Sequence, residues 1–220
     1  HHYGICVGGD LTVGASRTVT AAAGNADYGS SGIDIEGALS VGKNAVVTAS
    51  SGDTTSGYSI GVYGKAELTL GEGAKLSATS GKALNSSERY YGSMGIWLEP
   101  GAVSLGKNAT LEATGADASG EGASSYGLYI GGLTVGEGAS VTAKSGSAET
   151  TRGISNYGAD INVAGGTVKA TAGDAAGTDS YSFGIDATDC DMRVSGAGTV
   201  NATGGKAINS VGIELSQGFS

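Results

Sequence analysis

The stretch 32–49, GIDIEGALSVGKNAVVTA, contains one complete copy of a pattern that recurs along the whole chain. It begins with a Gly-aliphatic pair at 32–33, continues to an apolar-x-apolar triplet at 39–41, and closes on Val47 and Ala49. Alternation with a period of two in short runs is typical of β-strands. The stretch therefore predicts three short strands separated by tight turns.

The pair occurs eight times and the rest of the pattern seven times, at intervals of 26 to 34 residues between successive pairs. The pairs begin at Gly4, Gly32, Gly61, Gly95, Gly127, Gly153, Gly184 and Gly212. The triplets begin at Leu11, Leu39, Leu68, Val103, Leu133, Ile161 and Met192. The pattern closes on Ala21, Ala49, Ala78, Ala113, Ala143, Ala170 and Ala202. Repeats of this length, without a helical period, are typical of solenoids.

These repeats predict an all-β fold: a single-stranded, right-handed parallel β-helix with about seven coils of three short strands each. The hand follows from the general chirality of parallel crossovers. Coils of such a solenoid stack about 4.8 Å apart, so each inward side chain packs on its equivalents above and below. We expect one β-helix domain over residues 1–220, with a narrow point at the recurring Ala.

The composition fits this fold although it is unusual for a globular protein. Leu, Ile, Val and Phe make up 40 of the 220 residues and Gly 42, and so low an aliphatic content is typical of disordered chains. Disordered chains usually also have high charge and much proline. Here charged residues are only 15% and Pro occurs once, which favours few but regularly placed apolar residues.

Charge and hydropathy exclude several classes of partner. Twelve Lys and Arg against 21 Asp and Glu, a net charge of −9, leave no basic patch for nucleic acid. No apolar run approaches the roughly 20 residues of a membrane helix, so we expect no membrane insertion.

His1-His2 indicates a tag remnant on a segment excised from a longer, exported protein. Neither end carries a polar cap, so we expect further coils or end-to-end self-association.

Coils of this type, with Gly-Ile, Leu-Thr-Val-Gly and Ser-Val-Thr-Ala segments, resemble the repetitive β-helical surface proteins of bacteria. These include predicted carbohydrate-binding solenoids of Gram-positive gut bacteria and the passenger domains of autotransporter adhesins. The resemblance covers nearly the whole chain and rests on coil-forming residues. It implies a secreted or cell-surface bacterial protein whose partner is a glycan or a protein of the host or cell surface.

The residue after each Gly-aliphatic pair is expected to face outward. In three successive coils it is Tyr63, Trp97 and Tyr129, which predicts a flat aromatic strip suited to the apolar face of a sugar ring. Polar contacts at its rim are assigned to four residues: Glu88, Arg89, Tyr90 and Glu99. The alternative is that the aromatic rings stack to stabilise the sheet, or lie beneath the inserts 82–94 and 116–126.

Enzymatic chemistry finds little support. A polysaccharide lyase or hydrolase on this architecture needs paired carboxylates, or a metal with an Arg or Lys base. The densest acidic group is Asp186, Asp189 and Asp191, and we find nothing that complements it. It is interpreted as a solvated acidic turn, with weak Ca²⁺ binding as the alternative and no other cofactor or metal.

The predicted function is therefore a non-catalytic, adhesin-like or glycan-binding module. The alternatives are a purely structural stalk or, less favoured, a polysaccharide lyase or hydrolase.

Cys6 and Cys190 lie six coils apart, about 29 Å, and cannot form a disulfide with each other. We expect Cys190 to point into the core and Cys6 to point outward.

Overall fold

The computed structural model describes residues 1–86, 92–216 and 218–219, and consists of strands, turns and loops. Sheet A contains, in spatial order, β1 (His2–Val7), β4 (Gly29–Ile35), β7 (Tyr58–Gly64), β10 (Gly92–Leu98), β13 (Ser124–Ile130), β16 (Thr150–Tyr157), β19 (Tyr181–Thr188) and β22 (Asn209–Leu215). Sheet B contains β2 (Leu11–Val13), β5 (Leu39–Val41), β8 (Leu68–Leu70), β11 (Val103–Leu105), β14 (Leu133–Val135), β17 (Ile161–Ala164), β20 (Asp191–Ser195) and β23 (Gly218–Phe219). Sheet C contains β3 (Thr18–Ala22), β6 (Val46–Ser50), β9 (Lys75–Thr79), β12 (Thr110–Thr114), β15 (Ser140–Lys144), β18 (Thr167–Thr171) and β21 (Thr199–Thr203).

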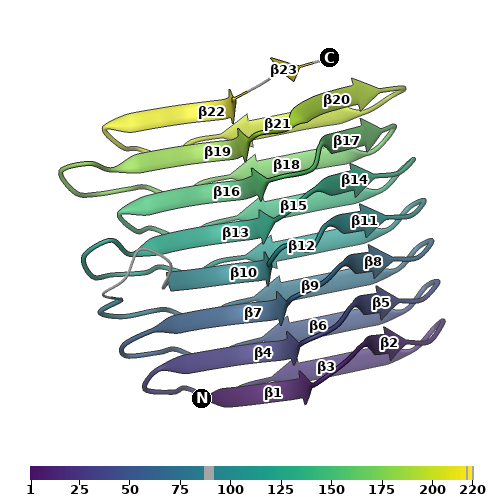
Figure 1. Cartoon of the computed structure of the whole chain (residues 1–220), viewed down its shortest axis with the longest axis horizontal. Helices are drawn as coiled ribbons and strands as arrows, with labels where there is room; N and C mark the ends of the chain where they lie inside the picture. The colour runs from purple at the N-terminus through teal and green to yellow at the C-terminus, as the bar shows by residue number, and fades with distance from the viewer. Residues whose placement is uncertain (87–91, 217, 220) are drawn as a thin grey trace.

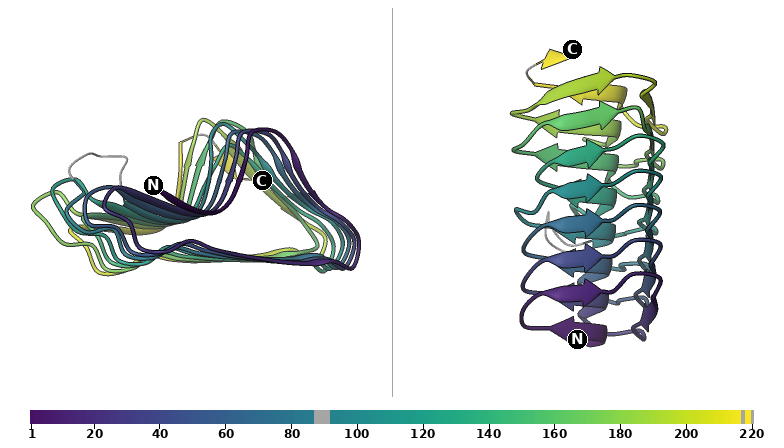
Figure 2. Two further views of the ribbon diagram at one scale, coloured as in Figure 1. Left: turned by 90° about the horizontal axis from the view of Figure 1, so that it is seen from below. Right: turned by 90° about the vertical axis from the view of Figure 1, so that its right-hand side faces the viewer.

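Every strand pairs in parallel with the strand three places away in the chain, so each coil adds one strand to each sheet. The coils rise from β1 to β22 with a right-handed sense (Figures 1 and 2). The predicted all-β solenoid of about seven coils is thus confirmed. Sheet B follows the predicted triplets, while the strands of sheet A are longer than expected, at six to eight residues.

Each coil encloses two parts of different chemistry. The wider part, which we call the wedge, lies between the three sheets and holds the apolar core, with Leu68, Ile96, Leu128 and Ile154 all fully buried. The narrower part, the arm, is formed by the first two or three residues of each sheet A strand and the segment that follows each sheet C strand. Viewed along the axis, the wedge and the flat arm are distinct (Figure 2).

A constriction of Gly and Ala separates the wedge from the arm. A Cβ placed on Gly95 would lie 2.5 Å from Thr114 N, 2.7 Å from Gly127 O and 2.8 Å from Ala113 C. Equivalent contacts to the backbone of the recurring Ala are found at Gly61 and Gly127. The expected narrow point therefore lies where sheet A touches sheet C. At this contact sheet A turns away from sheet C, so its outer surface is concave (Figure 2).

The arm is closed by hydroxyl groups together with a small cluster of buried alanines that includes Ala83, Ala118 and Ala148. Ser93 Oγ donates to the Gly81 carbonyl at 2.9 Å and accepts from the Ala116 N–H at 2.7 Å. Ser125 Oγ likewise donates to the Ala116 carbonyl at 2.8 Å and accepts from the Gly146 N–H at 2.9 Å. Fully buried hydroxyls stand at the same place in six successive coils: Ser30, Ser59, Ser93, Ser125, Thr151 and Ser182. They satisfy backbone groups that the arm would otherwise bury without partners.

Candidate functional site

The outward column of sheet A has the register that the repeat predicts. Trp97 pairs with Tyr63 on one side and with Tyr129 on the other. The rings do not form a flat strip, however. The Tyr63 and Trp97 centroids are 5.3 Å apart with the planes at 72°, and the Trp97 and Tyr129 centroids are 6.1 Å apart at 86°. Each ring thus presents its edge to its neighbour, an arrangement that stabilises aromatic clusters by about 0.5–1.5 kcal/mol a pair.

These rings cover a small apolar cluster outside the main core. Ile60 and Met94 alternate with the inward Ser59 and Ser93, and so face outward, yet they are only 1% and 2% exposed. Together with Tyr126 they pack against the partly buried Tyr63, Trp97 and Tyr129. Trp97 Nε1 is buried, without a hydrogen-bond partner among the residues that the structure describes. The middle of the predicted strip is therefore a packed cluster, although a ligand role for its residues stays a prediction.

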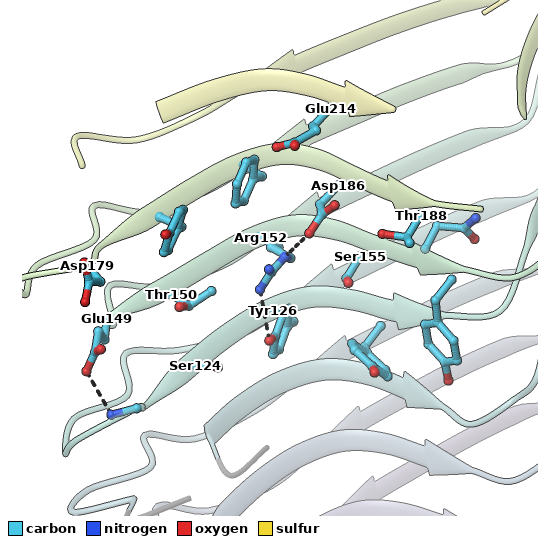
Figure 3. A pocket seen from close by; sticks show the side chains of 16 residues that line it. Ser124, Tyr126, Glu149, Thr150, Arg152, Ser155, Asp179, Asp186, Thr188 and Glu214 are labelled. Atoms are coloured by element: carbon cyan, nitrogen blue, oxygen red, sulfur yellow. Dashed lines mark hydrogen bonds and ion pairs between the residues drawn. The ribbon is translucent and has the colours of Figure 1, made fainter. Parts of the chain in front are cut away.

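Beyond Tyr129 the concave outer face of sheet A opens into a groove. The outward column continues through Ser155, Asp186 and Glu214, and the small Ser155 leaves space between Tyr129 and Asp186. The groove has a volume of about 740 Å³ and crosses β13, β16, β19 and β22 (Figure 3). Its aromatic lining consists of Tyr126, Tyr129, Tyr157, Tyr181 and Phe183. Among these, Tyr181 and Phe183 stack at 6.0 Å with their planes at 10°.

Arg152 occupies the centre of the groove (Figure 3). Its Nε donates to Asp186 at 2.5 Å and its Nη1 to the Tyr126 hydroxyl at 3.1 Å. Its guanidinium carbon lies 5.5 Å from the Tyr126 ring centroid and 5.3 Å from that of Phe183. Burial lowers the pKa of Arg152, but Tyr126 and Asp186 outweigh this effect and the net pKa is raised. The guanidinium therefore stays charged and ties three strands together.

Two tyrosines have a raised pKa: Tyr157, which lines the groove, and Tyr58, which lies away from it at the start of β7. Tyr157 donates its hydroxyl to the Leu98 carbonyl at 2.9 Å and lies 4.6 Å from the Tyr129 ring centroid. Burial, followed by repulsion from Tyr129 and Glu99, raises the pKa of Tyr157. Burial is also the largest cause that raises the pKa of Tyr58 to about 12.

Alkali should therefore destabilise the fold. The unfolded chain loses its phenol protons near pH 10, whereas folded Tyr58 keeps its proton to about pH 12. The contribution of Tyr58 to the free energy of unfolding is fully present below pH 10 and is lost as the pH rises from about 10 to 12. Urea unfolding at several alkaline pH values should show this decrease, and Tyr58→Phe should reduce it. An equally steep decrease in Tyr58→Phe would contradict the assignment.

The other predicted site residues are placed as follows. Glu88, Arg89 and Tyr90 lie outside the described residues. Glu99 is exposed and directly follows β10. Four residues that line the groove were not among the site residues predicted from the sequence: Arg152, Tyr157, Tyr181 and Phe183. Arg152 and Phe183 immediately precede their Gly-aliphatic pairs, so reading the repeat one column earlier would have revealed them.

The sequence suggested that no residue complements the acidic group, but two of its three members have arginine partners. Asp186 pairs with Arg152, and Asp191 accepts from Arg193 Nη2 at 2.8 Å. The Asp189 N–H donates to Ser216 Oγ at 2.7 Å. Over the described part of the chain, no three His, Cys, Asp or Glu side chains converge as metal ligands would. Weak Ca²⁺ binding here stays a prediction.

Cys190 is buried and Cys6 exposed, as expected, and both are free thiols.

Comparisons with known proteins identify no family for the chain. No family model matches the chain. A search of curated proteins found no match either. Among solved structures, a trypsin-treated form of QnrB1, a plasmid-mediated fluoroquinolone resistance protein, aligns over 96% of this chain and 92% of its own. The identity is 14% and the TM-score 0.18, so this likeness carries no argument. No helix within the described residues is long and apolar enough to span a membrane.

Proposed function

We propose that the chain is a non-catalytic glycan-binding module of a secreted or cell-surface bacterial protein, and that the glycan binds in the groove on sheet A. The observation that carries the proposal is the hollow of about 740 Å³ beside an aromatic-lined, concave surface. Ligand sites are typically concave, with apolar walls and a few polar groups. Tyr181 is 38% exposed and stacks parallel to Phe183, so its face suits the apolar side of a sugar ring.

Two of the four carboxylates that line the groove, Asp186 and Glu149, are engaged within the protein. Glycoside hydrolysis needs two carboxyl groups free to act as acid and as base or nucleophile. Asp186 is engaged by Arg152, and Glu149 accepts from the Gly122 N–H at 2.8 Å. Both are thus used to hold strands and a loop together. A structural stalk remains the second candidate, favoured by the continuous ladders of buried residues along all three sheets.

Glycan-array screening followed by titration calorimetry tests the proposal. We expect Tyr181→Ala to weaken binding roughly tenfold because it removes one exposed aromatic face. The melting temperature should change little, since Tyr181 is exposed. The matched control is Tyr28→Ala, an equally exposed tyrosine in the loop before β4. Absence of binding to any glycan would favour the stalk. Equal losses in both variants would place the ligand elsewhere.

A further inference from the structure

The groove is lined by more carboxylates than cations. The charged residues that line it are Arg152, Glu149, Asp179, Asp186 and Glu214. They come from different strands and loops and surround the aromatic lining (Figure 3). The field in the groove therefore depends on which of these charges are already balanced.

The positive charge is balanced and partly covered. Arg152 pairs with Asp186 at 2.5 Å, and the two side chains are only 20% and 19% exposed. Its guanidinium also contacts the rings of Tyr126 and Phe183. Two of its five N–H donors, and part of its attraction for anions, are thus used within the protein.

The negative charges facing solvent are not balanced in this way. Asp179 and Glu214 are exposed, and Glu149 bonds to a neutral backbone N–H. The net charge of −9 over the whole chain adds to the negative potential. Tyr129, Tyr157 and Tyr181 also line the groove, and the faces of aromatic rings attract cations.

We infer that the groove selects cationic sugar chains, whose units carry protonated amino groups, over neutral and acidic ones. The inference rests on the proposed glycan-binding function and names its ligand class. The sugar rings pack on the exposed aromatic faces, and the ammonium groups lie near Asp179 and Glu214. A uronic-acid chain meets unbalanced carboxylates and one guanidinium that is already paired.

The test compares three oligosaccharides of equal length by calorimetry at mildly acidic pH: a glucosamine oligomer, an N-acetylglucosamine oligomer and a galacturonate oligomer. We expect the glucosamine oligomer to bind about tenfold more tightly than the acetylated one. Its affinity should fall as salt is raised, because exposed charges are screened. The galacturonate oligomer should not bind measurably.

A double variant locates the selectivity. Asp179→Asn with Glu214→Gln should weaken glucosamine-oligomer binding about threefold to tenfold and leave N-acetylglucosamine binding unchanged. The matched control, Asp27→Asn with Glu112→Gln, removes the same charge from exposed positions outside the groove and should preserve the preference. An equal effect of both variants would overturn the inference.

The outcomes separate the two proposals. Equal, salt-independent binding of the amino and N-acetyl oligomers overturns the charge selectivity and leaves glycan binding in place. Preference for galacturonate likewise overturns the selectivity alone. Failure of all three oligomers, together with a blank glycan array, overturns both.

Discussion

Gly127→Ala is expected to destabilise the protein by about 3 kcal/mol or more, or to prevent folding. The added methyl group would lie 2.5 Å from Gly153 O, 2.6 Å from Lys144 N and 2.9 Å from Ala143 C. All three atoms belong to the backbone of neighbouring strands, so no flexible side chain can move aside. The cost arises from lack of space at the constriction between wedge and arm. Chemical denaturation followed by circular dichroism would measure it.

Gly8→Ala is the matched control. No heavy atom within the described parts of the chain lies within 4 Å of a Cβ placed on Gly8. The same substitution there should leave the free energy of unfolding unchanged, or raise it by a few tenths of a kcal/mol through the unfolded chain. If Gly127→Ala proves as mild as Gly8→Ala, sheets A and C do not touch at the constriction.

Arg152→Met is expected to lower the free energy of unfolding by about 2–4 kcal/mol. Removal of one partner from a buried ion pair costs about 3–5 kcal/mol, because the other charge is left without compensation. Here about one fifth of each side chain is exposed, so the cost should lie toward the lower end. The variant also loses the hydrogen bond to Tyr126 and the contacts with two aromatic rings. Urea unfolding would measure the change.

A double-mutant cycle isolates the pair from these other contacts. Arg152→Met with Asp186→Ala should recover part of the loss, because no carboxylate then remains unpaired. Lys43→Met serves as a surface control, since Lys43 and Glu72 pair at 2.8 Å with more than half of each side chain exposed. Its stability should match that of the wild type. Purely additive effects of the Arg152 and Asp186 substitutions would show that the pair itself contributes nothing.

The sequence was sufficient to predict the coils because each inward position repeats. The triplets at Leu39 and Leu133 begin strands β5 and β14 residue for residue. The recurring Ala, such as Ala113, correctly indicated a narrow point. Both signals depend only on side-chain size and alternation, which a repeat displays in every coil.

The arm and the groove could not be predicted in the same way. The arm is filled by buried hydroxyls such as Ser93 and Ser125 and by small alanines such as Ala83, which give no strong apolar signal in the sequence. The bend of sheet A at the repeated glycine, Gly153 in β16, brings two outward columns together, so that Arg152 meets Asp186, 34 residues away. Counting alternation along one strand does not reveal contacts between columns. The tilt of the Trp97 ring likewise depends on the cluster of Ile60, Met94 and Tyr126 against which it packs.

The groove crosses the strands instead of following one of them, and neighbouring strands in a sheet lie about 4.8 Å apart. Each coil of the solenoid therefore adds one strand, and with it one row of outward side chains, to the surface that a ligand lying along the axis would contact. The spacing of these side chains along the axis is thus set by the spacing of the strands. A polymer whose repeating unit is close to that spacing would place successive units in step with successive coils. Substitutions in a single coil would then report on a single unit of the polymer.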